Sequence, residues 1–276
     1  MKVMIIDITR CNGCYNCQIA CKDEHVGNDW TPYAKPQPDT GQFWMNITDM
    51  VRGTVPKTKL TYIPRICQHC DDAPCINACK QNAINKRPDG AVIVDPLKCS
   101  GRMDCIVSCP YKELIFFNET LNIAQKCTFC VHLLDRGWKE PRCVEVCPTG
   151  ALKFGEEEEF KELIAGAEIL HPEYGTRPRV YYIGLPKNFL TGAVFNPDKD
   201  EVVIGAKATL TNLKTGQTLI TRSDSLGDFW FKDIDKGEYS LEIEADGYQT
   251  QLINGIKVEK DFNLGDIAML YSNNIS

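Results

Sequence analysis

The distribution of cysteine is the feature that most limits what this chain can fold into. Fifteen cysteines occur among 276 residues, and all of them lie between Cys11 and Cys147. An odd count, with no recognisable export signal near the N-terminus, argues against a disulfide framework. The cysteines instead form four groups with recurring spacings: Cys11, Cys14, Cys17 and Cys21; Cys67, Cys70, Cys75 and Cys79; Cys99, Cys105 and Cys109; and Cys127, Cys130, Cys143 and Cys147.

The spacing within these groups predicts iron–sulfur clusters. The first group, CNGCYNCQIAC, has the form C-x2-C-x2-C-x3-C. In such a run three close cysteines wrap one [4Fe–4S] cluster, and the fourth ligates the other cluster of a pair. A structural zinc protein is the alternative, but the run crowds more thiolates than one four-coordinate zinc ion can take. A zinc protein would also be colourless.

The third group departs from this pattern at one position. In CSGRMDCIVSCP, residues 99–110, Arg102 stands where a second cysteine would complete the motif. Arginine stays protonated and offers no lone pair to a metal. Three thiolates suit a [3Fe–4S] cluster, a [4Fe–4S] cluster with another fourth ligand, or an empty site. Asp104 is one residue out of phase for a substitute ligand. Arg102 either raises the potential of a neighbouring cluster or pairs with a surface acid.

Short strand-like and helix-like segments surround the cysteine groups. The last C-x3-C of each group has the spacing of one helical turn, so we expect a short helix there. Residues 156–170 have apolar side chains at helical spacing after an acidic start, which predicts a further helix. Residues 22–66 are expected to form a long inserted loop. Short apolar runs bounded by turn residues predict four strands, at 3–7, 91–95, 114–118 and 151–154.

The character of the sequence changes at about residue 188. In GEYSLEIEADGY, Tyr239, Leu241 and Ile243 alternate with polar residues, as in a strand with one buried face. Turn residues recur at 214–217, 226–228 and 246–247, which is typical of a small antiparallel sandwich. We therefore predict an α+β chain. A duplicated bacterial-ferredoxin-like cluster domain at 1–187 precedes an all-β, transthyretin- or immunoglobulin-like sandwich at 188–276.

Composition excludes several classes of function. The net charge is −6 and basic residues are scattered, so nucleic acid is not expected as a partner. No apolar run is long enough to span a bilayer. The chain has no nucleophile paired with a base, no phosphate loop and no dinucleotide fingerprint, so it shows no catalytic site of its own. These features predict a cytoplasmic protein.

Several polar residues lie beside the cysteines without completing a ligand set. We expect histidines near the cysteine groups to be structural rather than metal ligands, since most sites already have four cysteines. The lysines beside ligand cysteines are expected to be ordinary surface lysines, although they could tune cluster potentials. The histidines are His25, His69 and His132, and the lysines are Lys22, Lys80 and Lys126.

Taken together, the four groups resemble the iron–sulfur electron-transfer subunits of molybdopterin oxidoreductases, the dimethyl sulfoxide reductase family. The motifs CQHCDDAPC, CPTGAL and RPRVYYIGLP carry this resemblance over the first 186 residues. It implies that the first and fourth groups share two sites and that the second and third groups share two more. The implied ligand sets are Cys11, Cys14, Cys17 and Cys147; Cys21, Cys127, Cys130 and Cys143; Cys67, Cys70, Cys75 and Cys109; and Cys79, Cys99 and Cys105.

The resemblance also implies a function. Such a subunit would be non-catalytic and would pass electrons through three [4Fe–4S] clusters to or from a separate molybdenum or tungsten pterin subunit, as a heterodimer. A related subunit with a non-cysteine residue at the position of Arg102 holds a three-iron cluster, which favours [3Fe–4S] in the fourth site. Export together with the partner would place the protein in the periplasm instead of the cytoplasm.

The C-terminal sandwich indicates a smaller group of proteins within this family. The order of cluster domain, linker and sandwich is similar to the small subunits of pyrogallol–phloroglucinol transhydroxylases and catechol dehydroxylases, which implies chemistry on polyhydroxylated aromatics. In the transhydroxylases the fourth cluster is lost. Two alternatives stay open: a subunit of another molybdopterin reductase acting on a sulfoxide or a sulfur or nitrogen oxyanion, and a free-standing polyferredoxin.

Overall fold

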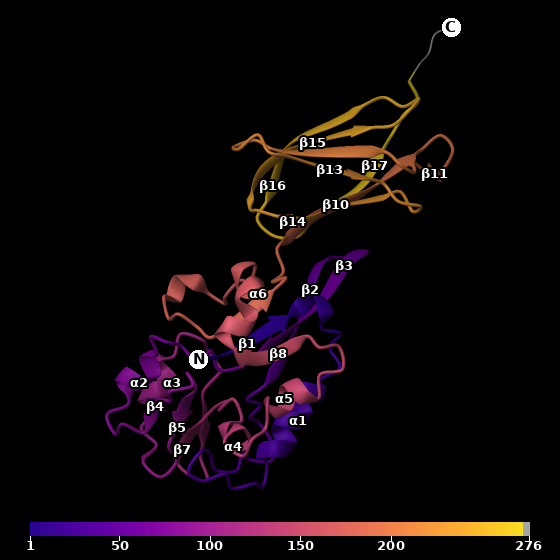
Figure 1. Cartoon of the computed structure of the whole chain (residues 1–276). Coiled ribbons are helices and arrows are strands. Elements are labelled where there is room, and N and C mark those ends of the chain that lie inside the picture. The colour runs from indigo at the N-terminus through magenta and orange to yellow at the C-terminus, as the bar shows by residue number, and fades with distance from the viewer. Residues whose placement is uncertain (273–276) are drawn as a thin grey trace. The chain divides into compact units, whose positions relative to one another are not determined.

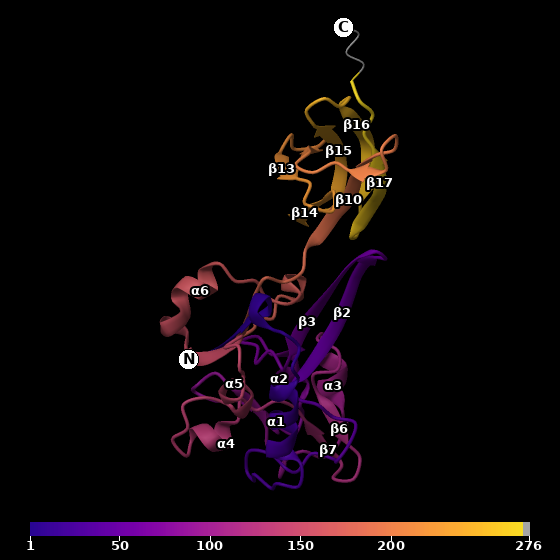
Figure 2. The same cartoon turned by 90° about the vertical axis from the view of Figure 1, so that its right-hand side faces the viewer.

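The computed structural model describes residues 1–272, which form two compact units. The first unit contains residues 1–50 and 62–185, and the second contains residues 51–61 together with the chain from residue 186 onward. Figures 1 and 2 show the two units from two directions. The second unit therefore includes a short segment, 51–61, that the sequence assigned to the cluster domain. No helix among residues 1–272 is long and apolar enough to cross a membrane.

A three-stranded sheet forms one side of the first unit. Strand β1 (Lys2–Asp7) lies between β8 (Leu152–Glu156), which is antiparallel to it, and β9 (Val180–Ile183), which is parallel. Because β1 is central, its run VMII is buried on both faces. Met4 pairs with Phe154 on one side and Val180 on the other. This sheet joins the start of the chain to the segment that follows the last cysteine.

Two small hairpins carry the chain between the cysteine groups. Strand β4 (Ile84–Lys86) pairs with β5 (Val92–Val94), and β6 (Phe116–Asn118) pairs with β7 (Ile123–Gln125), all antiparallel. All four predicted strands are present, as β1, β5, β6 and β8, although β5 and β6 are shorter than predicted and β8 is shifted toward the C-terminus.

Each predicted C-x3-C helix is also present. Helices α1 (Asn16–His25), α2 (Pro74–Ala78), α3 (Asp104–Ser108) and α5 (Arg142–Glu145) each contain the first cysteine of their pair. Helix α4 (Val131–Leu134) follows Cys130. Helix α1 packs against α5, and α2 packs against α3. The first cysteine group therefore lies beside the fourth, and the second beside the third.

Two predictions for the first unit were wrong in extent. The helix predicted at 156–170 is limited to a 3-10 turn, η2 (Glu157–Phe160), and α6 (Lys161–Ala165), because Gly166 ends it. A second 3-10 turn, η3 (Pro172–Tyr174), follows.

The second half of the predicted loop at 22–66 is instead a hairpin of β2 (Asn46–Thr54) and β3 (Lys57–Arg65). The hairpin accommodates two prolines, because Pro56 lies in the turn and Pro64 lies near the end of β3.

The second unit contains the predicted β-sandwich. One sheet contains β11 (Glu201–Val202), β10 (Asn188–Asn196), β14 (Asp228–Ile234) and β17 (Phe262–Ala268), and the other has the order β13 (Thr218–Arg222), β12 (Lys207–Asn212), β15 (Gly237–Glu244) and β16 (Gln251–Val258). The predicted alternation holds in β15, where Tyr239, Leu241 and Ile243 are buried. All pairs are antiparallel except β10 and β17, which are parallel.

The tip of the β2–β3 hairpin packs within this second unit. Arg52 Nη1 donates to the carbonyl of Lys187 at 2.6 Å and to Asp261 Oδ1 at 3.3 Å. Lys57 forms an ion pair with Asp228, and both side chains are mostly buried.

Candidate iron–sulfur sites

The fifteen thiols form four groups in the structure, and each group combines cysteines that are distant in the sequence. In the first group, burial raises the pKa of Cys17 to about 12, and the thiolates of Cys11, Cys147 and Cys14 raise it further, in that order. Burial also raises the pKa of Cys11, which is next to Cys147 and Cys14. Three cysteines at the start of α1 therefore lie beside Cys147, which follows α5.

Cys147 differs from the other thiols of this group. Burial acts to raise its pKa, but the backbone N–H groups of Leu152, Ala151 and Thr149 and the Thr149 hydroxyl bring the pKa below its usual value. These donors favour the thiolate, which is the form that binds a metal. The turn after Cys147, in CPTGAL, therefore provides a set of hydrogen-bond donors for one ligand.

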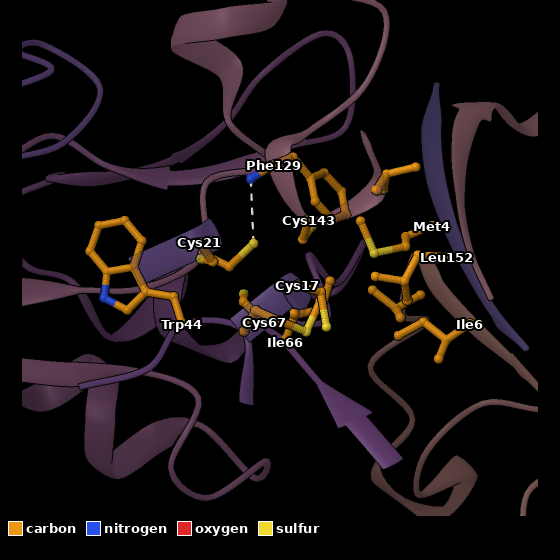
Figure 3. Close-up of a cluster of buried hydrophobic side chains, with 14 of the residues drawn as sticks. Met4, Ile6, Cys17, Cys21, Trp44, Ile66, Cys67, Phe129, Cys143 and Leu152 are labelled. Carbon is orange, nitrogen blue, oxygen red and sulfur yellow. Dashed lines mark hydrogen bonds between the residues drawn. The ribbon is translucent and has the colours of Figure 1, made fainter. Parts of the chain in front are cut away.

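The second group lies in the interior of the first unit. Burial raises the pKa of Cys21 and of Cys143 well above the usual value, and the thiolates of Cys130 and Cys127 raise both further. All four thiols line one pocket of about 310 Å³. Cys21, Cys143 and neighbouring core residues are drawn in Figure 3, where a dashed line starts at the backbone nitrogen of Phe129. This N–H donates to Cys127 Sγ at 3.4 Å.

The third group joins α2 to the end of α3. Burial raises the pKa of Cys109 to about 12, followed by the thiolates of Cys67, Cys75 and Cys70. Burial likewise raises the pKa of Cys70 to about 12. Four thiols from the second and third sequence groups therefore surround one position.

The fourth group contains three thiols in a second pocket. Burial raises the pKa of Cys105 to about 11, and Cys75, Cys99 and Cys79 contribute after it. The pocket has a volume of about 330 Å³, similar to that lined by the four thiols of the second group. Two backbone N–H groups point at its sulfurs: Ala83 N lies 3.3 Å from Cys79 Sγ, and Ala124 N lies 3.4 Å from Cys99 Sγ. Sulfurs that accept backbone hydrogen bonds are suited to holding a negative cluster.

Arg102 lines this pocket but its charged group is turned outward. Its Nε donates to Asp104 Oδ2 at 2.9 Å, and the Arg102 side chain is 49% exposed. This contact agrees with the alternative in which Arg102 pairs with a surface acid. Asp104, which the sequence placed out of phase for a ligand, is engaged by Arg102.

Each C-x3-C helix contributes to two of the four groups. Cys17 and Cys21, one helical turn apart on α1, belong to the first and second groups. Cys75 on α2 and Cys79, the residue directly after this helix, belong to the third and fourth groups. The same relation holds for Cys105 and Cys109 at α3 and for Cys143 and Cys147 at α5.

The residues present suit iron–sulfur clusters. Three of the groups offer four thiols each and the fourth offers three, and thiolates are the donors that iron–sulfur clusters take. In the described part of the chain, no three His, Cys, Asp or Glu side chains are arranged to hold a single metal ion.

The histidines near the cysteines are buried, and two of them have polar partners within 3.0 Å. His132 Nε2 lies 3.0 Å from Glu24 Oε1, and His69 Nδ1 accepts a hydrogen bond from Val92 N at 3.0 Å. His25 Nε2 lies 3.9 Å from Cys130 Sγ, and burial lowers the pKa of His25 to about 3, so it is neutral. Neutral, buried histidines agree with a structural role.

The three lysines beside the cysteine groups differ in burial, and not all of them are surface residues as predicted. Lys80 is exposed, as expected. Lys22 is half-buried and donates to the carbonyls of Pro38 and Gln42. Lys126 is fully buried, so the prediction of a surface lysine was wrong. No signal in the sequence separates Lys126 from Lys80, because both directly adjoin a ligand cysteine.

Comparison with known proteins supports the same interpretation of both parts of the chain. Residues 58–157 match the family model for a 4Fe-4S dicluster domain, and residues 190–269 match the carboxypeptidase regulatory-like domain.

Three relatives show how far the likeness extends. The chain is 39% identical to the pyrogallol hydroxytransferase small subunit of Pelobacter acidigallici, over 88% of this chain and 90% of that one. It is 36% identical to a tetrathionate reductase subunit of Salmonella typhimurium, over 68% of this chain and 74% of that one. It is 30% identical to the arsenate respiratory reductase iron–sulfur subunit of a Shewanella species, over 65% of this chain and 94% of that one.

Proposed function

Because the chain belongs to the family of iron–sulfur electron-transfer subunits of molybdopterin oxidoreductases, we propose that it transfers electrons between a catalytic partner and a second redox protein. When bound, the clusters supply one-electron acceptance and release. The chain supplies the thiolates, the apolar surroundings that keep water from the sulfurs, and the hydrogen bonds that fix the potentials. It contributes no catalytic residue of its own.

The proposed ligand sets follow the four thiol groups. They give three [4Fe–4S] clusters, each with four cysteine ligands. Support comes from the mutual proximity of the thiols in each set and from the pocket of the second set. The sets are Cys11, Cys14, Cys17 and Cys147; Cys21, Cys127, Cys130 and Cys143; and Cys67, Cys70, Cys75 and Cys109.

The fourth site is proposed to hold a [3Fe–4S] cluster on Cys79, Cys99 and Cys105. Its pocket is similar in volume to that of the second site, and backbone N–H groups already point at two of its three sulfurs. Arg102 is turned to Asp104 and gives no fourth ligand. A three-iron cluster needs none, because it lacks the iron that the missing thiolate would bind.

The organisation is proposed to be a duplicated ferredoxin-like domain at 1–187 and a sandwich at 188–276. The packing of α1 on α5 and of α2 on α3 supports two equivalent halves, each with a pair of helices that share ligands between two sites. The sandwich is proposed as a docking surface for the catalytic subunit.

The catalytic partner is proposed to be a separate molybdenum or tungsten pterin subunit that acts on polyhydroxylated aromatics, by hydroxyl transfer or dehydroxylation. One observation carries this choice. The alignment with the pyrogallol hydroxytransferase small subunit covers 88% of this chain, so it must include much of the sandwich. The alignment with the tetrathionate reductase relative covers only 68% of the chain. We propose a cytoplasmic location, in a heterodimer.

Anoxic purification of the tagged chain with its bound partners tests this proposal. Elemental analysis should give iron together with molybdenum or tungsten, with about 15 irons per chain if the fourth site holds three and about 12 if it is empty. The oxidised sample should show a [3Fe–4S] EPR signal, and an EPR-silent sample would contradict the fourth cluster. The isolated complex should transfer or remove hydroxyl groups of pyrogallol-type substrates. Iron without either pterin metal would favour a free-standing polyferredoxin, and zinc without iron would contradict the proposal.

A further inference from the structure

Lys126 is a charged side chain in the interior of the cluster-binding unit. It lies directly after β7, its side chain is 1% exposed, and it is among the largest fully buried side chains of the described chain. A buried ammonium group is costly unless its charge and its donors are compensated. The environment of Lys126 therefore needs an explanation that a surface lysine does not.

The ammonium group has two backbone partners. Nζ donates to the carbonyl of Val92 and, at 3.2 Å, to the carbonyl of Cys127. Two neutral carbonyls hold the group in place, so negative charge must come from the thiolates.

Those thiolates belong to two different sites. The charges that act on Lys126 are those of Cys67, Cys75 and Cys127. Cys67 and Cys75 are in the proposed third ligand set, and Cys127 is in the second. In return, Lys126 lowers the pKa of Cys75 and of Cys127 against the larger effect of burial. The charge of Cys67 also raises the pKa of Cys127.

We infer that Lys126 is a positioning residue for electron transfer, a fixed cation between the second and third cluster sites that raises the reduction potential of both. This inference rests on the proposed function. Reduction adds negative charge to a site, and a cation held nearby in a medium of low dielectric constant stabilises the reduced form. The effect is larger for the third site, because two of the three thiolates that act on Lys126, those of Cys67 and Cys75, belong to it.

The test compares reduction potentials of the whole chain, purified anoxically with its bound partners, by EPR-monitored redox titration. Lys126→Met removes the charge but keeps a side chain of similar length. Lys126→Arg keeps the charge. Lys80→Met is the matched control, since Lys80 also adjoins a ligand cysteine, Cys79, but is exposed and screened by solvent.

In Lys126→Met we expect two of the reduction steps to move to lower potential, one more than the other, while the remaining steps stay unchanged. Lys126→Arg should retain most of the wild-type potentials, and Lys80→Met should retain all of them. A purely structural lysine would leave the potentials of an iron-replete Met variant unchanged, and that result would overturn the inference. An equal fall in the Arg and Met variants would also overturn it.

Iron content separates the two proposals. If the Met variant loads less iron than wild type, Lys126→Gln, which is neutral but can donate hydrogen bonds, is titrated in its place with the same expectation. Wild-type protein without reducible iron would refute the proposed function itself, whereas reducible clusters with unshifted potentials in the neutral variants would refute only the role of Lys126.

Discussion

Arg102 donates from Nε to Asp104 Oδ2 at 2.9 Å, and this pair lies at the edge of the pocket lined by Cys79, Cys99 and Cys105. The pair removes both residues from the list of ligands that could complete the site. The missing fourth thiolate is therefore a property of one position on one loop, and a single substitution can restore it.

Replacing Arg102 by cysteine should convert the fourth site to a [4Fe–4S] cluster. The new thiol would complete the C-x2-C-x2-C-x3-C pattern, and four thiolates retain the iron that three do not. We expect about one more iron per chain and loss of the oxidised [3Fe–4S] EPR signal. Arg102→Ser is the control and should keep both at wild-type levels. An unchanged signal in Arg102→Cys would place that signal at another site.

Cys147→Ser should remove the first cluster and leave the sandwich folded. The hydrogen-bond donors of the turn that follows Cys147 favour its thiolate, and serine is a much poorer ligand for iron. We expect loss of about four irons and strongly reduced electron transfer to an artificial acceptor. Hydrogen exchange in the sandwich should match wild type, since no cysteine lies after residue 147. Full electron transfer in this variant would contradict the relay.

Arg179→Met should destabilise the cluster-binding unit by about 2–3 kcal/mol, because it leaves the half-buried carboxylate of Asp71 with only Lys86. Arg179 is 5% exposed and binds both oxygens of Asp71, at 2.7 and 2.9 Å. Anoxic urea unfolding measures the loss. Arg177→Met is the control: Arg177 also binds both oxygens of an aspartate, Asp72, but is 69% exposed, so we expect little change.

The ion pair between Arg179 and Asp71 also predicts how the stability of the cluster-binding unit depends on pH. Burial acts to raise the pKa of Asp71, but Arg179 and Lys86 bring it below its usual value of 3.8. A carboxyl group with a lowered pKa in the folded state stabilises the fold above its unfolded pKa, and this contribution disappears as the pH falls through the folded value. The difference in the free energy of unfolding between wild type and Arg179→Met should therefore stay constant from about pH 8 to about pH 5. A gap that closes within this range would assign the effect to another group.

Asp261→Ala should loosen the second unit around the hairpin tip. Asp261 accepts from the backbone N–H of Phe189 at 3.0 Å and from Arg52 at 3.3 Å, and it is mostly buried. Loss of these partners should cost about 2 kcal/mol. Hydrogen exchange should become faster in residues 51–61 and at the start of β10. Glu259→Ala, an exposed carboxylate two residues away, should leave both segments unchanged.

The sequence was most informative where spacing alone determines structure. The C-x3-C pairs predicted four short helices, and the alternation of Tyr239, Leu241 and Ile243 predicted a half-buried strand; both predictions are confirmed. The extent of other elements depends on tertiary contacts that spacing does not encode. The β2–β3 hairpin contains prolines that argue against strands, yet its tip is held by Arg52 and Lys57.

The roles of charged residues were the least predictable. Lys80 and Lys126 both adjoin a cysteine, and only the fold shows that one is exposed and the other lies among thiols of two sites. Likewise, nothing in CPTGAL alone shows that backbone N–H groups lower the pKa of Cys147.

The sharing of each C-x3-C helix between two thiol groups has an evolutionary consequence. A substitution at Cys17, Cys75 or Cys105 would affect a helix that carries, or directly precedes, a cysteine of a neighbouring thiol group, so it would disturb two groups. Arg102 lies on the loop before α3, outside any shared helix. A lineage could therefore lose a thiolate at this position while keeping the neighbouring sites intact, and gradual erosion of a multi-cluster chain would begin at such unshared loop positions.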